Sequence, residues 1–178
     1  MAVDVRAIAA LLCLASCTSV QQEGVALNGM TTARSGDLAA IDAAIDGVYA
    51  VISGPVGQQR DFARMRSLFM PDARLSSMTA SGIRGGTLED YIARSGPGLV
   101  SSGFTERELD RRVEIYGDIA HAWSSYEGSF TQGDGTRGTV RGINSFQLAR
   151  QDGRWLVQSI FWQAESPEFP LPQDMDGE

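Results

Sequence analysis

The spacing of apolar residues changes near Phe104, and this change narrows the range of folds open to the chain. Before it, apolar residues recur every three or four positions, the period of an amphipathic helix, as in Leu38, Ile41, Ile45, Val48 and Ile52. After it, apolar and polar residues alternate, which is the period of a strand with one solvated face. Helices followed by a run of strands predict an α+β fold, with the helices packed on one face of a curved antiparallel sheet.

We expect three helical segments before the change. Their ends are marked by N-capping residues and by Gly and Pro, which interrupt helices. The segments run from Ser35 or Asp37 to Gly54-Pro55, from about Asp61 to Met70-Pro71, and from the capping sequence Thr87-Leu-Glu-Asp90 to Gly96-Pro97-Gly98. A short extended piece over 73–77 lies between the last two.

Four strands are expected after the change, joined by turns at Gly117-Asp118, Gly133-Asp134-Gly135 and Asp152-Gly153. In the first strand, Leu109, Arg111, Val113 and Ile115 alternate with Glu108, Asp110, Arg112 and Glu114. This alternation predicts that the charged stripe from Glu106 to Glu114 is a solvated strand face. The strands are expected over about 104–115, 119–131, 139–150 and 155–164.

The N-terminus has the organisation of a bacterial export signal. Met1 to Arg6 is a short head, and the apolar run 7–16 is too short for a membrane-spanning helix, which needs about twenty residues. The run ends in Leu14-Ala15-Ser16-Cys17, which resembles a lipobox and implies lipidation of Cys17. We therefore expect an exported, periplasmic lipoprotein anchored at the outer membrane. The alternative is an ordinary secretory signal and a soluble secreted protein.

These features divide the chain into a signal peptide (1–16), a flexible tether (17–37), one α+β domain (38–166) and a loose acidic, Pro-rich tail (167–178). The formal net charge of −7 argues against a nucleic-acid partner, because phosphate binding needs a basic surface. The two cysteines lie at positions 13 and 17, and His121 is the single histidine. The domain therefore has no thiol chemistry and no multi-His site. We expect no metal and no cofactor.

Several stretches carry a family resemblance, which covers about residues 38–166. They are "FARMRSLFMPDARL", "TLEDYI", "GFTERELDRRVEIYGDIAHAWSSYE" and "RGINSFQLARQDGRWLVQSIFW". Together they resemble the NTF2-like, or SnoaL-like, superfamily, and in particular its uncharacterised bacterial members. The resemblance implies a cone in which a curved sheet and the first helices enclose a cavity.

The same resemblance implies one known mechanism, ketosteroid isomerisation. This mechanism needs one Asp as general base and a second, protonated Asp as hydrogen-bond donor. Counting on from Asp72, the base position falls near Ser77, and the donor position falls near Asn144. Neither residue is an acid, so the isomerase mechanism is not carried over. We expect Asp72 to fix the Pro-Asp turn.

Five residues are candidates for ligand binding in the implied cavity: Tyr49, His121, Trp123, Asn144 and Trp162. His121 is either a general base or a half-buried sheet histidine, and Asn144 either binds a ligand or satisfies backbone groups. No catalytic residue is assigned.

Three functions remain open at this point. The preferred interpretation is an exported module without catalysis that binds a small hydrophobic ligand or a partner protein. The alternative is a small SnoaL-like enzyme of the isomerase, dehydratase or hydrolase type, with His121 as base and Asn144 as donor. The third is a structural homodimer. In all three the lipid anchor is the only contact with a membrane.

Overall fold

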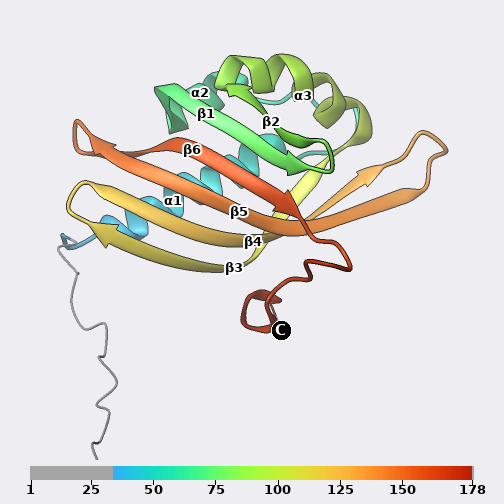
Figure 1. Ribbon diagram of the computed structural model, residues 1–178. Helices are drawn as coiled ribbons and strands as arrows, with labels where there is room; N and C mark the ends of the chain where they lie inside the picture. Colours follow the sequence, from blue (N-terminus) through green and yellow to red (C-terminus); the bar gives the residue numbers. More distant parts are fainter. Residues whose placement is uncertain (1–33, 178) are drawn as a thin grey trace, which may run out of the picture.

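The computed structural model describes residues 34–177, which form a curved sheet with helices packed against it (Figure 1). Its elements are α1 (Asp37–Ile52), α2 (Phe62–Leu68), β1 (Phe69–Thr79), β2 (Gly82–Thr87), α3 (Leu88–Ser102), β3 (Thr105–Tyr116), β4 (Ile119–Thr131), β5 (Arg137–Gln151), β6 (Arg154–Ala164) and the 3-10 helix η1 (Gln173–Met175). The α+β class is confirmed.

The export signal and Cys17 lie outside the described residues. Between residues 34 and 177 no helix has the length and apolar character needed to cross a membrane.

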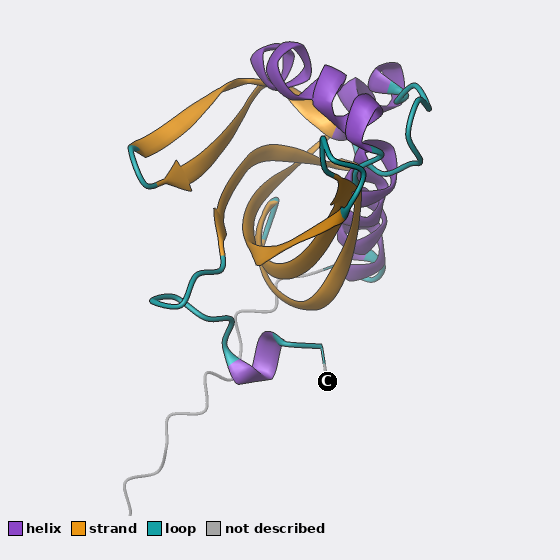
Figure 2. Ribbon diagram, turned by 90° about the vertical axis from the view of Figure 1, so that its right-hand side faces the viewer, coloured by secondary structure: helices purple, strands orange, loops and turns teal. Residues whose placement is uncertain are grey.

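The sheet has six strands in the order β2-β1-β6-β5-β4-β3. Every neighbouring pair is antiparallel except β1 and β6, which are parallel. Viewed end-on, the strands curl around an interior that α1 and the other helices cover on one side (Figure 2). The turn between β5 and β6 has positive φ at both Asp152 and Gly153, as a two-residue hairpin of this sequence requires.

The core forms where one face of α1 meets the inward face of the sheet. Ile41 and Ile45 of α1 are fully buried, and Phe146 of β5 and Val157 of β6 are at most 1% exposed. Each such side chain contributes roughly 1.5–3 kcal/mol by leaving water. The helical spacing seen in the sequence therefore places α1 against the sheet, as predicted.

Arg60 ties the ends of two helices to the start of β3. It is 6% exposed and donates to five backbone carbonyls: Ile52 (2.9 Å), Gln58 (2.5 Å), Gly54 (2.7 Å), Leu99 (2.7 Å) and Phe104 (3.2 Å). Burial lowers the Arg60 pKa. The negative ends of α1 and α3 both point at this guanidinium, and their carbonyls take the place of a carboxylate partner.

The segment between α2 and α3 is more extended than the sequence predicts. The strand β1 begins at Phe69 and continues through Pro71, with an irregular register between Phe69 and Arg74. Asp72 is an exposed strand residue there, so its predicted role in a turn is wrong. The strand β2 was not predicted, because four of its six residues are Gly or Thr and the stretch is typical of a loop.

The helix α3 is longer than predicted. Its capping box is confirmed, since Asp90 N–H donates to Thr87 Oγ1 (3.2 Å) and Thr87 N–H donates to Asp90 Oδ2 (2.9 Å). However, the helix passes through the exposed Pro97 and ends at Gly103, which has a positive φ of 61°. Leu99, beyond the proline, is buried, and its packing offsets the missing backbone hydrogen bond.

The C-terminal segment, expected to be loose, packs against the outer face of the sheet. Met175 of η1 is fully buried, and ion pairs join Asp174 to Arg112 and Asp176 to Arg141. Figure 1 shows this segment leaving the end of β6 and ending below the lower edge of the sheet, where β3 lies. A buried anchor and two ion pairs therefore fix a segment that its composition alone marks as a tail.

Candidate functional site

A cavity of about 300 Å³ lies between the helices and the inward face of the sheet. Most of its walls are apolar or aromatic. They are formed by Val48, Tyr49, Ile52, Met65, Leu75, Tyr91, Ser95, Leu99, Phe104, Glu106, Tyr126, Val140, Asn144, Phe146, Ile160, Trp162 and Ala164. An apolar cavity with a few convergent polar groups is the usual form of a small-molecule site.

Glu106 reaches this cavity because β3 contains a bulge. Arg111 pairs with Ser124 and Glu108 pairs with Tyr126, while the register shifts between Glu108 and Asp110, so that Leu109 is the extra residue. A bulge of this kind reverses the alternation of the strand beyond it. Glu106 and Glu108 therefore lie on the inward face together with Arg111. The prediction that the stripe from Glu106 to Glu114 is solvated is wrong for these two acids.

Burial raises the pKa of the Glu106 carboxyl from 4.5 to about 7, and a hydrogen bond from Asn144 opposes part of this rise. Asn144 Nδ2 donates to Glu106 Oε1 at 3.2 Å. No Arg, Lys or His is among the residues that line the cavity. Glu106 is thus the one carboxyl among the residues that line the cavity, and it titrates near neutral pH.

A directional chain of hydrogen bonds leads from Asn144 back to Arg111. Asn144 Nδ2 also donates to Tyr49 Oη (3.1 Å), so the Tyr49 proton is directed to Ser124 Oγ (2.6 Å), and Ser124 donates in turn to Glu108 Oε1 (2.5 Å). A hydroxyl that accepts one hydrogen bond and donates another has little capacity left for a ligand. The Tyr49 hydroxyl therefore orients Asn144 and does not serve as a donor to the cavity.

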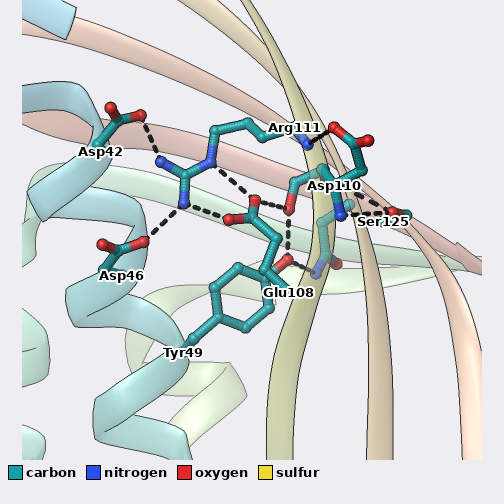
Figure 3. Close-up of polar contacts among 9 residues, drawn as sticks. Asp42, Asp46, Tyr49, Glu108, Asp110, Arg111 and Ser125 are labelled. Atoms are coloured by element: carbon teal, nitrogen blue, oxygen red, sulfur yellow. Dashed lines mark hydrogen bonds and ion pairs between the residues drawn. The ribbon is translucent and has the colours of Figure 1, made fainter. Parts of the chain in front are cut away.

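Arg111 terminates this chain, as Figure 3 shows. Its guanidinium lies between Glu108 of β3 (2.5 and 2.7 Å) and two acids of α1, Asp42 (2.6 Å) and Asp46 (2.7 Å). The ion pairs hold β3 against α1 on the side of the bulge. They also compensate the charge of Glu108, which leaves Glu106 as the acid without a cationic partner.

Two further tyrosines line the cavity, Tyr91 on α3 and Tyr126 on β4. Burial, and next the charge of Glu106, raise the pKa of both phenols above the ordinary value. Neither hydroxyl has a hydrogen-bond partner among residues 34–177. They are therefore neutral donors that remain available to a ligand.

Three of the five sequence candidates reach the cavity: Tyr49, Asn144 and Trp162. Asn144 is also paired with Trp162 across β5 and β6, so the two side chains share the inward face. Tyr49 is 6% exposed, so its side chain is buried at the cavity wall.

The other two candidates, His121 and Trp123, lie on the outer face. Asn144 pairs with Ser124, and His121 is three residues from Ser124 in a regular ladder, so the histidine points the opposite way. Its Nε2 lies 3.1 Å from Ser145 Oγ, and its ring centre lies 5.9 Å from that of Trp123. His121 and Asn144 therefore do not act on one ligand, and the proposed base and donor pair is not brought together.

Sequence reasoning missed Glu106, Tyr91 and Tyr126. The inward direction of Tyr126 follows from its even spacing from Ser124, once the pairing of β4 with β5 is known. Glu106 could not be found, because nothing in the local sequence marks Leu109 as a bulge. The remaining acids form no metal site: within residues 34–177, no three His, Cys, Asp or Glu side chains are grouped to hold an ion.

Comparison with known proteins identifies the fold. No protein-family profile matches the chain, and no curated protein is similar to it in sequence. Among solved structures, an NTF2-like protein of unknown function from Methylobacillus flagellatus has a TM-score of 0.53 and 14% identity, covering 76% of this chain and 97% of that one.

Two other solved structures are similar to a comparable degree. A protein with a cystatin-like fold from Caulobacter vibrioides has a TM-score of 0.57 and 13% identity, covering 74% of this chain and 91% of that one. A hexachlorocyclohexane dehydrochlorinase from Novosphingobium barchaimii has a TM-score of 0.60 and 14% identity, covering 72% and 86%. The resemblance in the sequence and these structural likenesses agree, and the chain has the fold of the NTF2-like superfamily.

Proposed function

We propose that this protein is an exported binding module whose cavity holds a small, mostly apolar molecule. The observation that carries the proposal is the position of Glu106, a single ionisable carboxyl at the wall of an apolar cavity. A carboxyl kept out of water without a cation lowers stability, so a role in ligand recognition gives a reason for it. Glu106, Asn144, Tyr91 and Tyr126 form the polar end of the site.

The cavity volume limits the size of the ligand. An apolar cavity of about 150 Å³ takes up benzene. A cavity of about 300 Å³ therefore accommodates on the order of a dozen non-hydrogen atoms. This is a molecule the size of a substituted aromatic ring or a short branched chain, with one polar group directed at Glu106.

Native mass spectrometry of the protein purified from its own host tests this proposal. We expect a co-purifying small molecule, which is lost when Ser95, on the cavity wall, is replaced by Phe. Ser101→Phe is the matched control, because Ser101 is exposed on the same helix. A wild-type protein that carries no small molecule, and takes none up from a library of apolar compounds of this size, would contradict the proposal.

A second candidate function is proton transfer, which the pKa of Glu106 favours. A carboxyl that titrates near pH 7 is suited to remove a proton from a carbon next to a carbonyl, and the Tyr91 and Tyr126 hydroxyls are suited to stabilise the oxyanion that results. Glu106 then returns the proton to another carbon, which completes an isomerisation without a cofactor. A carbonyl substrate that the wild type converts and Glu106→Gln does not would favour this function over binding alone.

The export of the protein rests on the sequence around Cys17. A diacylated Cys17 would hold the domain at the outer membrane on its polar tether. Labelled palmitate should be incorporated by the wild type and not by Cys17→Ala. A wild type that takes up no label, and is recovered as a soluble secreted protein, would favour the ordinary secretory signal.

A further inference from the structure

The cavity combines one carboxyl with an unusual share of aromatic rings. Six of its lining residues are aromatic: Tyr49, Tyr91, Phe104, Tyr126, Phe146 and Trp162. They come from α1, α3, the residue before β3, β4, β5 and β6, and so surround the interior from several sides. The Tyr91 and Trp162 rings are perpendicular with centroids 6.2 Å apart, and form two adjoining walls.

The charges around Glu106 do not balance within the protein. From β5 it receives an amide hydrogen bond from Asn144, and from α3 and β4 it faces the neutral phenols of Tyr91 and Tyr126. From α1, the Tyr49 hydroxyl is committed to Ser124. The ionised form of Glu106 therefore has hydrogen-bond donors around it and no cation.

Neither Arg111 of β3 nor Arg94 of α3 forms an ion pair with Glu106. Glu108, on the same face of β3, is paired with Arg111, whose guanidinium also serves Asp42 and Asp46. The positive charge of Arg94, on α3, opposes part of the rise in the Tyr91 pKa. Arg94 is not among the residues that line the cavity. A half-buried carboxylate without a cationic partner is costly, and a ligand that brings the missing cation would remove this cost.

We propose that the ligand is an organic cation, a protonated amine or quaternary ammonium with an apolar body, that pairs with Glu106 among these aromatic rings. This proposal rests on the proposed function, namely that the cavity binds a small molecule. Aromatic rings attract cations through their negative faces, and cages of such rings recognise quaternary ammonium groups in other proteins. A ligand anion would meet the charge of Glu106 with no cation to offset it.

The proposal makes binding depend on pH. A quaternary ammonium does not titrate, so any change in its affinity near neutral pH reports on the protein. It binds to the ionised form of Glu106, and protonation of that carboxyl competes with it. Its affinity should therefore fall as the pH drops below the Glu106 pKa, reach about a tenth of its alkaline value once that carboxyl is protonated, and level off above the pKa.

A matched pair of probes separates charge from shape. Benzyltrimethylammonium and neopentylbenzene have the same outline, each with about eleven non-hydrogen atoms, and differ in a positively charged nitrogen in place of carbon. Tryptophan fluorescence of the purified protein reports binding, because Trp162 lines the cavity. A purely apolar cavity would prefer neopentylbenzene, because the ammonium loses favourable hydration on entry.

We expect benzyltrimethylammonium to bind about tenfold more tightly than neopentylbenzene at pH 8, and to lose this preference at pH 5. Glu106→Gln should remove the pH dependence and weaken ammonium binding at pH 8 about tenfold while retaining neopentylbenzene. Glu114→Gln, on the exposed outer face of β3, is the control and should behave as the wild type.

Two results would overturn the proposal, and they differ in what else they overturn. Tighter binding of neopentylbenzene at pH 8, together with ammonium affinity that does not change with pH, refutes the cation and leaves the apolar ligand site standing. Binding of neither probe at any pH refutes the ligand site itself. The pH series in the wild type needs no variant, so the test does not depend on how Glu106→Gln folds.

Discussion

Replacing Glu106 by Gln should stabilise the protein at alkaline pH and leave its stability unchanged in acid. The Glu106 pKa is about 7 in the folded protein against an ordinary value of 4.5. At 1.36 kcal/mol per pH unit, this difference corresponds to about 3 kcal/mol as an upper value, because relaxation and water entry reduce the cost of a buried charge. We expect Glu106→Gln to raise the free energy of unfolding by roughly 1–3 kcal/mol at pH 8.

The direction follows from where the proton is bound. Below pH 4.5 the carboxyl is protonated in both the folded and the unfolded chain, and burial carries no charge penalty. Between pH 4.5 and 7 the unfolded chain releases the proton while the folded protein keeps it, so wild-type stability falls as pH rises. Above pH 7 the full penalty is present, and the glutamine, which never ionises, avoids it.

Urea denaturation at pH 4.5, 6 and 8, followed by tryptophan fluorescence, measures the effect. The informative quantity is the difference between variant and wild type at each pH, because the titration of all other groups cancels in it. Glu114→Gln on the solvated face of the same strand should show no such trend. A difference for Glu106→Gln that is constant from pH 4.5 to 8, or that falls with pH, would show that this carboxyl is not desolvated.

Three further changes test the frame around the cavity. Arg60→Met leaves five carbonyls without their donor. Urea denaturation should show a free energy of unfolding lower by about 3–5 kcal/mol. A loss below about 1 kcal/mol would mean that water replaces the guanidinium. Tyr49→Phe removes the acceptor that orients Asn144, which weakens the hydrogen bond from Asn144 to Glu106. The Glu106 pKa, followed by carbon NMR of the carboxyl, should therefore rise further. An unchanged pKa would contradict the hydrogen-bond chain. Met175→Asp should release the C-terminal segment, because Met175 is its buried anchor. Limited proteolysis should then cut within 165–177, while probe binding persists. Continued resistance to cleavage would show that the ion pairs of Asp174 and Asp176 are sufficient to hold the segment.

The architecture followed from the sequence wherever one period governed a whole element. The helical spacing of Ile41 and Ile45 predicted α1, and the Asp152-Gly153 pair predicted the turn between β5 and β6. The residue pattern did not predict the structure where tertiary contacts outweigh the local preference of the chain. Pro97 lies inside α3 because the residue Leu99 beyond it is buried, and the acidic C-terminal segment is held by Met175.

The candidate site followed from the sequence only in part, for a geometric reason. Asn144 and Trp162 were found because regular alternation places both on the inward face of adjacent strands. The same alternation, counted from Ser124, puts His121 and Trp123 on the outer face, which required the register between β4 and β5 to be known. The carboxyl of Glu106 depended on an irregularity in β3 that residue spacing does not encode.

The bulge at Leu109 also bears on how this chain is compared with its structural relatives. A relative whose corresponding strand is regular has one residue fewer between the positions of Glu106 and Asp110, so a correct alignment needs a gap opposite Leu109. Without that gap, Glu106 is matched to a residue that points to solvent, and Arg107 is matched to the cavity position. Searches for acids shared across this fold would then pass over the one that this cavity contains.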